Sequence, residues 1–228
     1  MKIQKTSALI FMLCFSGSLL AQHNFFMNTG YSRRLSDSPN ELFVNQKSDK
    51  DHRNTLKNGL NLNFAYDYTL KSYLAVGFRT NMFGSFDSYT DNQTSPNTPL
   101  TCSDDEYVFY IGPCARYIFK PIADKWTMSL RGTLGLMLLQ NSQTSPSYNT
   151  TSKAYTTATT TYSGNCFSWG IDAMADYSIN SWLSLNGSLG FMSGSIGKLK
   201  AVDQSFKLNN GNENLSRIDL AIGVSIKL

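Results

Sequence analysis

The sequence predicts an all-β fold, an eight-stranded antiparallel up-and-down transmembrane β-barrel with short periplasmic turns and long extracellular loops. Three observations predict it. The 228-residue chain is rich in aromatic residues (13%) and poor in charged ones (16%). Long segments alternate apolar with polar residues, and short and long connections between them alternate. The aromatic content excludes intrinsic disorder, and a net charge of only +4 argues against a nucleic-acid partner.

The N-terminus has the organisation of a secretory signal. Lys2 and Lys5 precede the apolar run Ser7–Leu20, and small residues follow before the expected cut. The run is shorter than the roughly 20 residues that a spanning helix needs. We therefore expect residues 1–21 to be a cleaved signal peptide and residues 22–228 to be the barrel domain, with 18 basic against 16 acidic side chains and a net charge near +2.

Four strands are expected in the first half of the chain. The first strand, around Asn24–Leu35, is the least regular. Gly59–Leu70 alternates most strictly, with an apolar residue at every second position over more than ten residues. A short turn at Lys71-Ser72 leads into Tyr73–Phe86, which continues the pattern, and Tyr107–Phe119 repeats it.

The second half follows the same scheme. A short connection at Pro121–Lys125 leads into a strand at Trp126–Leu139. Strands at Phe167–Ile179 and Trp182–Ile196 are separated by the turn Asn180-Ser181. The chain closes on an alternating strand, Arg217–Leu228. The total is eight, and an even number places both termini at the rim with the short turns.

The other connections are long and polar. Loops of such length are uncommon in compact soluble domains, whereas outer-membrane barrels carry short turns at one rim and long loops at the other. The third loop is nearly all Thr, Ser, Asn, Tyr and Gln, so we expect it to be mobile. The expected loops are Ser36–Lys57, Asp87–Asp105, Gln140–Asn165 and Gly197–Asn214.

Alternation alone also fits a soluble sandwich, so strand length and residue placement decide. Each expected strand exceeds the ~9–11 residues that a tilted membrane strand needs. Aromatic residues gather at strand ends beside the short turns, as an interfacial girdle requires. They are Tyr68, Tyr73, Tyr117, Phe119, Trp126, Tyr177 and Trp182.

The polar strand faces carry four Asp and four Arg, which would lie inside the barrel. An eight-stranded barrel is just filled by its side chains, and buried charges must be paired. We therefore expect these residues to form a structural charge network that closes the lumen. The predicted network is Asp67, Arg79, Arg116, Arg131, Asp172, Asp176, Arg217 and Asp219.

Two stretches carry a family resemblance. Tyr110–Phe119 (YIGPCARYIF) resembles the strand motif G-P-x-x-R-Y-Y-F of the outer-membrane β-barrel domain family, the OmpA/OmpX-type small eight-stranded barrels. Gly170–Tyr177 (GIDAMADY), followed by Trp182–Leu185, is similar to that family's sixth and seventh strands. The resemblance covers the mature chain loosely and implies a membrane barrel. Pro113 lacks a backbone N–H within its strand, so we expect a β-bulge there.

Few residues are suited to catalysis or metal binding. Enzymes among small membrane barrels resemble hydrolases in needing a His near the outer rim, and the mature chain holds only His23 and His52, neither within a regular strand. The acidic stretch Ser103–Glu106, with Asp87 and Asp91, lacks a nearby base; the simplest interpretation is a solvated rim, with a divalent cation as the alternative. We expect no catalytic residues, no metal site and no cofactor.

Three cysteines remain after the signal. Cys102 and Cys166 lie near the long-loop rim, where a disulfide between them is one possibility. Cys114 lies deeper on the inward face and is interpreted as a small packing residue.

The sequence favours a non-enzymatic protein of the cell outer membrane, with a structural or adhesion-like, surface-interaction role through its long loops. Its expected partners are outer-membrane lipid and, through the loops, lipopolysaccharide or surface ligands. We expect a monomer and no nucleic acid. Three alternatives stay open: a narrow pore, a lipid-modifying outer-membrane enzyme and a soluble secreted ligand-binding β-barrel.

Overall fold

The structure is a computed structural model that describes residues 23–36, 54–91, 100–121, 124–149, 154–201, 204–207 and 212–228. The expected signal peptide, residues 1–21, and His52 lie outside the described residues. No helix in the described ranges is long and apolar enough to cross a membrane.

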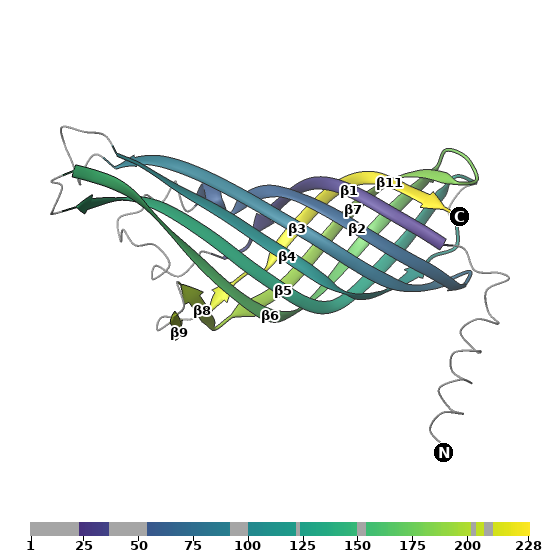
Figure 1. The fold of residues 1–228 in the computed structure, drawn as a ribbon. Coiled ribbons are helices and arrows are strands. Elements are labelled where there is room, and N and C mark those ends of the chain that lie inside the picture. Colours follow the sequence, from purple (N-terminus) through teal and green to yellow (C-terminus); the bar gives the residue numbers. More distant parts are fainter. Residues whose placement is uncertain are drawn as a thin grey trace, which may run out of the picture.

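Eight long strands form a closed antiparallel ring, as the alternation predicts (Figure 1). From β1 to β7, each strand pairs with the next one along the chain, including β6 with β7. Strand β11 closes the ring by pairing with both β7 and β1. The ring consists of β1 (His23–Arg34), β2 (Asn58–Lys71), β3 (Leu74–Asp91), β4 (Leu100–Ile118), β5 (Trp126–Asn149), β6 (Ala154–Ser178), β7 (Leu183–Ile196) and β11 (Arg217–Lys227).

Both described ends of the chain lie at the rim with the short turns, as predicted. The backbone of His23 and that of Leu228 exchange two hydrogen bonds, at 3.2 and 2.8 Å. The turns between β2 and β3, β4 and β5, and β6 and β7 lie at this rim. An even number of strands returns the chain to the rim from which it started.

The alternation sorts side chains between the two faces of the wall. On β4, Tyr107 (50% exposed) and Phe109 (37%) point outward, whereas Val108 and Tyr110, which alternate with them, are fully buried. The same holds around the ring, where the outward positions are mostly large apolar side chains. A closed wall with an apolar outside and a filled inside is the arrangement of a membrane barrel rather than of a soluble one.

Two of the predicted loops are largely β-structure, which corrects the expectation of loops at Asp87–Asp105 and Gln140–Asn165. In the second of these, the register runs without interruption to Asn149 paired with Ala154, so these residues form paired strands instead of the predicted loop. Thr-rich polar segments satisfy their backbone groups by cross-strand pairing, and β-branched Thr favours extended structure.

The ends of β3, β4, β5 and β6 form a sheet that continues beyond the rest of the ring (Figure 1). We call this part the projecting sheet, residues 86–91, 100–105, 142–149 and 154–161. Within the described residues, its β3 portion pairs only with β4, and its β6 portion only with β5.

The fourth long connection also contains strands that the sequence did not predict. They are β8 (Lys198–Ala201), β9 (Gln204–Lys207) and β10 (Glu213–Asn214). β8 pairs with β6 at Tyr162 and Ser163 and therefore continues the wall where β7 has ended.

The bulge predicted at Pro113 is wrong. Pairing between β4 and β5 is interrupted at Gly112 and Pro113, but the register on both sides is the same, so no residue is inserted. The missing N–H of Pro113 opens the ladder without shifting it. A register shift occurs instead between Thr69 and Lys71, next to the first short turn.

Candidate functional site

Asp67 is the centre of a buried ion cluster near the short-turn rim. One of its oxygens accepts hydrogen bonds from Arg116 Nε (2.7 Å) and Arg131 Nη2 (3.0 Å). Asp176 lies 3.8 Å from the other side of the Arg116 guanidinium, and the Cys114 thiol faces Asp67 at 3.5 Å. These side chains come from β2, β4, β5 and β6, so the cluster links one half of the wall through the lumen.

A second group of ions lies farther along the lumen. Arg79 pairs with Asp172 at 2.7 Å and donates to Asn63 Oδ1 at 2.9 Å. Arg217 pairs with Asp219 on its own strand at 3.2 Å and also donates to Asn81. The eight predicted charges thus lie inside the barrel, at most 5% exposed, and divide into these two groups.

Phe26 is a member of the first group that the sequence analysis missed. Its ring lies 4.7 Å from the Arg116 guanidinium carbon and 4.6 Å from that of Arg131. An inward Phe on β1 fills the space that the two arginines leave and attracts their charge through its π-face. Phe25, the preceding residue, is 44% exposed, so Phe26 follows the alternation of inward and outward residues. The irregular pattern of the first strand hid this alternation in the sequence.

A third buried ion cluster joins three strands towards the long-loop rim. Arg34 donates to both Glu106 oxygens at 2.8 Å and also pairs with Glu213. This corrects the interpretation of the acidic second loop as solvated and without a base, because Glu106 and Asp104 are buried and Arg34 compensates Glu106. Asp105, between them, is exposed. The partner was not visible in sequence because Arg34 and Glu106 are 72 positions apart.

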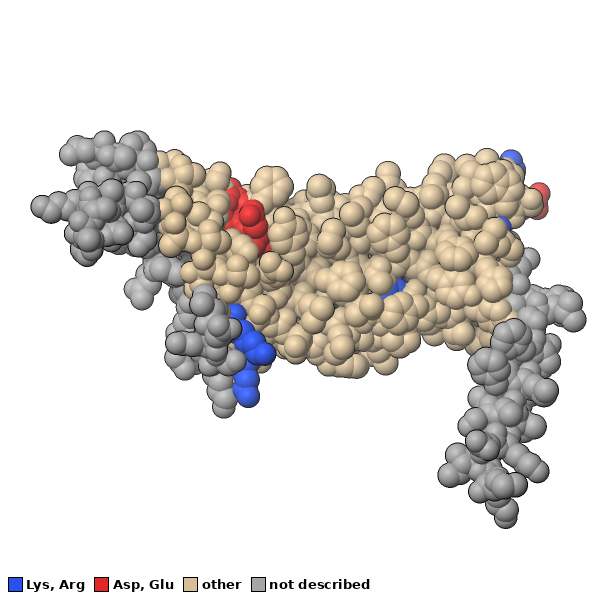
Figure 2. Space-filling view, in the orientation of Figure 1, with Lys and Arg blue, Asp and Glu red and all other residues tan. Residues whose placement is uncertain are grey.

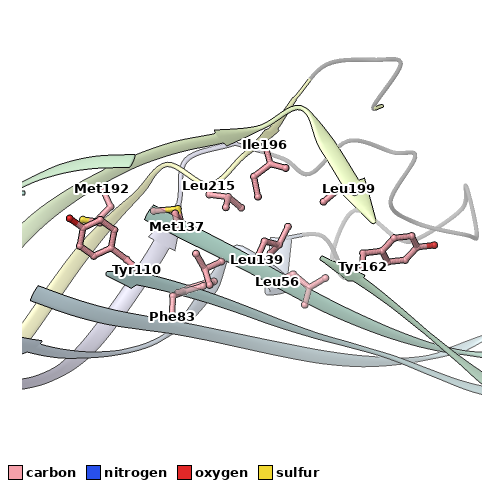
Figure 3. Packing of buried hydrophobic residues seen from close by; sticks show 11 residues of the cluster. Leu56, Phe83, Tyr110, Met137, Leu139, Tyr162, Met192, Ile196, Leu199 and Leu215 are labelled. Carbon is pink, nitrogen blue, oxygen red and sulfur yellow. The ribbon is translucent and has the colours of Figure 1, made fainter. Parts of the chain in front are cut away.

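Apolar side chains fill the same part of the lumen (Figure 3). The cluster extends from Tyr110 and Met192 at one end to Tyr162 and Leu199 at the other. The Tyr110 hydroxyl is hydrogen-bonded to Thr133, and Arg217 lies 5.5 Å from the centre of the Phe83 ring within the cluster. The members are Leu56, Phe83, Val108, Tyr110, Met137, Leu139, Tyr162, Met192, Ile196, Leu199 and Leu215.

The described residues contain no cluster of three or more potential metal ligands. His23 donates to or accepts from the Tyr66 hydroxyl at 2.7 Å at the short-turn rim. No disulfide joins Cys102 to Cys166, so that possibility is corrected, while Cys114 is buried in the lumen as its inward position predicted.

The outer wall carries the aromatic residues of the predicted girdle. Tyr117 contacts Tyr73 and Phe119, with ring centroids 6.1 and 5.1 Å apart, and Trp126 contacts Tyr177 at 5.1 Å. On the face shown in Figure 2, almost all charged side chains lie towards the two ends of the barrel, with an uncharged belt between them. Aromatic rings bordering such a belt are typical of strands in a bilayer.

Comparisons with known proteins agree with this geometry. No family model matches the sequence, and no curated protein matches it. Among solved structures, a major outer membrane protein from Thermus thermophilus aligns with a TM-score of 0.56 and 13% identity, over 91% of this chain and 99% of that one. The fold is that of an outer-membrane β-barrel.

Two further similar structures align with TM-scores below 0.5. Ail, the attachment invasion locus protein of Yersinia pestis, in complex with the heparin analogue sucrose octasulfate, aligns with a TM-score of 0.42 and 13% identity over 90% of this chain and 99% of that one. The outer membrane protease OmpT from Escherichia coli aligns with 0.33 and 10% identity over 91% and 96%.

The three ion clusters of the barrel interior join strands of the wall to one another. Their carboxylates face guanidinium groups, which are permanently protonated and therefore poor proton donors or acceptors. The chemically distinctive surfaces lie elsewhere, on the projecting sheet and on the outer wall beneath it.

Proposed function

We propose that this protein is a non-enzymatic barrel of the cell outer membrane that displays the projecting sheet to the outside as an interaction surface. The observation that carries the proposal is the unequal height of the wall, since β5 and β6 have 24 and 25 residues. A membrane strand needs only ~9–11 residues, so much of each strand stands beyond the bilayer.

The composition of the projecting sheet supports an interaction role. Its hydroxyl side chains pair across the strands, with Ser142 and Thr161 at 3.2 Å and Thr144 and Thr159 at 3.0 Å. An ordered polar sheet loses less entropy on binding than a mobile loop would, so it presents groups to a partner at lower cost. Within the described residues, each of its two outer strands has one unpaired backbone edge, which is suited to strand addition.

The side chains that fill the lumen favour a closed barrel rather than a pore. Arg79, Arg131 and Arg217 are the largest fully buried side chains, and the apolar cluster fills the interior beyond them. In planar bilayers we expect no stable conductance steps from the purified protein. Regular steps that persist after refolding would contradict this and favour the narrow pore.

An outer-membrane address is tested by fractionation and by gel mobility. We expect the mature chain in the outer-membrane fraction and a band that shifts on heating, because a folded barrel binds less detergent than the unfolded chain. A soluble periplasmic product without a heat shift would contradict the proposal and favour a soluble ligand-binding barrel.

The surface role is tested by shortening the β5–β6 hairpin. Replacing residues 142–161 with a two-residue Asn-Gly turn removes the longest part of the projecting sheet and leaves the ring intact. We expect cells carrying the native protein to adhere to heparin-coated wells better than cells without the gene, and cells carrying the shortened protein to lose that difference. Undiminished adhesion, with the shortened barrel folded in the membrane, would contradict a role for this sheet.

The enzyme alternative has its own readout. A lipid-modifying enzyme would change the mass spectrum of lipid A on overexpression, and His52→Ala would abolish the change. We expect an unchanged lipid A spectrum from cells that overproduce either form.

A further inference from the structure

A groove of about 880 Å³ runs across the outside of the wall at the boundary between the apolar belt and the projecting sheet. Its floor is apolar and comes from Tyr107 and Phe109 on β4 and Leu138 on β5. Its far side is formed by β8, which contributes Lys198 and Lys200. We propose that this groove binds one phosphate-bearing lipid of the outer leaflet, with its phosphate at the two lysines and its acyl chains along the floor.

The fold directs both lysines outward. On β8, Leu199 points inward and is fully buried in the lumen cluster, so its two neighbours must point to the other face. Both lysines are exposed, and pairing of Lys200 with Ser163 fixes the strand against β6. Figure 2 shows this basic patch directly beside the uncharged belt.

The outward rows on the strands show where the bilayer ends. On β5, Leu134, Leu136 and Leu138 are 55%, 56% and 43% exposed, and the next outward residue is Gln140. On β4 the outward row changes from Tyr107 to Asp105 one outward position farther along, since Tyr107 pairs with Gln140. The groove therefore crosses the level at which acyl chains give way to headgroups.

Charge and polarity together select the occupant. Two ammonium groups attract a phosphate and hold it as point charges. A free phosphate would leave the apolar floor without a partner, whereas a lipid covers floor and lysines together. Protein partners are less suited, because the floor continues into the lipid-facing belt at Leu138 and Leu136.

The experiment measures lipid retained by the full mature barrel after transfer to detergent micelles, by native mass spectrometry. The probes are diphosphorylated lipid A and the same lipid after enzymatic dephosphorylation. We compare the native sequence with K198A/K200A and with the control K71A/K125A, which removes two exposed lysines from the opposite rim.

We expect the native barrel and the control to retain one lipid A molecule. K198A/K200A should weaken retention about 30-fold, because each lysine near an anionic lipid surface contributes a gain of about fivefold. Millimolar inorganic phosphate should not displace the lipid. Equal loss in both double variants, no loss in K198A/K200A, equal retention of the dephosphorylated lipid, or full displacement by inorganic phosphate would each overturn the inference.

The inference rests on the proposed outer-membrane location, and heat-modifiable mobility separates the two failures. A barrel that shifts on heating but retains no lipid A refutes the lipid site and leaves the location intact. A chain that fractionates as a soluble protein refutes the location itself.

Discussion

Four of the ring's eight strands, β3 to β6, continue into the projecting sheet, yet the ring and the projecting sheet are stabilised differently. Within the ring, every strand has two neighbours, and buried ions and apolar side chains fill the space inside. In the projecting sheet, the outer two strands each have one described neighbour, and the visible side-chain pairs are hydroxyls such as Thr144 and Thr159.

The difference shows how one strand can lie partly in lipid and partly in water. The apolar face of β5 is useful only where lipid covers it, and it ends at Leu138. Beyond that level the strand keeps its hydrogen-bond ladder but changes its side chains to polar ones. Stability should therefore depend strongly on lumen residues and weakly on the projecting sheet, whereas binding should show the reverse.

The largest effect is expected from Asp67→Ala. It leaves Arg116 and Arg131 buried without their shared carboxylate, and breaking a buried pair from one side costs about 3–5 kcal/mol. Urea unfolding of the barrel in lipid vesicles measures the loss. The control is the exposed Asp105→Ala, for which we expect almost no change. Equal stability of both variants would remove the ion cluster as a cause of barrel stability.

A smaller loss is expected from Met137→Ala in the apolar cluster. Met137 is fully buried, and truncating such a side chain costs about 2–5 kcal/mol through lost contacts and a residual cavity. The same urea titration measures it, with the outward Met128→Ala as the matched control. A larger loss from Met128 than from Met137 would show that lipid contact outweighs lumen packing.

Gly77→Ala tests how closely the strands approach beside the ion cluster. An added methyl group would collide with the Tyr66 carbonyl oxygen and lie 2.8 Å from the Asp67 Cα on the adjacent strand. Overpacking of this kind costs about 1–3 kcal/mol. Gly132→Ala, which meets no atom within 4 Å, is the control, and urea midpoints of the two barrels give the comparison. Identical midpoints would contradict the close approach.

The smallest effect on stability is expected from shortening the hairpin at residues 142–161. These residues lie outside the filled lumen, so the barrel should lose less than about 1 kcal/mol, since changes distant from buried features are nearly neutral. The urea midpoint measures this, alongside the loss of adhesion described above. A loss as large as that of Asp67→Ala would mean that the sheet supports the ring.

Much of the fold could be predicted from local pattern. The strict alternation of Gly59–Leu70 predicted a strand and its lipid face, and the structure places β2 at Asn58–Lys71. The alternation also placed Arg116 and Asp172 inside. The alternation of apolar and polar residues in a strand depends on residues that are adjacent in the chain, so it can be predicted from the sequence.

The same reasoning failed where pairing overrides composition. Gln140–Asn165 is as polar as a loop, and its strand structure comes from neighbours across the hairpin rather than from its own hydropathy. The prediction of a bulge at Pro113 was wrong for a related reason. On the opposite edge of β4, pairing with β3 is uninterrupted and holds the register. Local signals do not include such partners.

The class of fold, the lipid-facing side of every strand but the first and the lumen position of the eight predicted charges follow from the low charge content and from the pleat, so they could be predicted from the sequence. Which of these charges meet depends on how the strands are arranged in the closed barrel. Asp67 is shared by two arginines, Phe26 contacts both of them, and Arg34 compensates Glu106. Barrel closure, strand tilt and stagger bring distant positions to one level of the lumen, and no local pattern encodes that level.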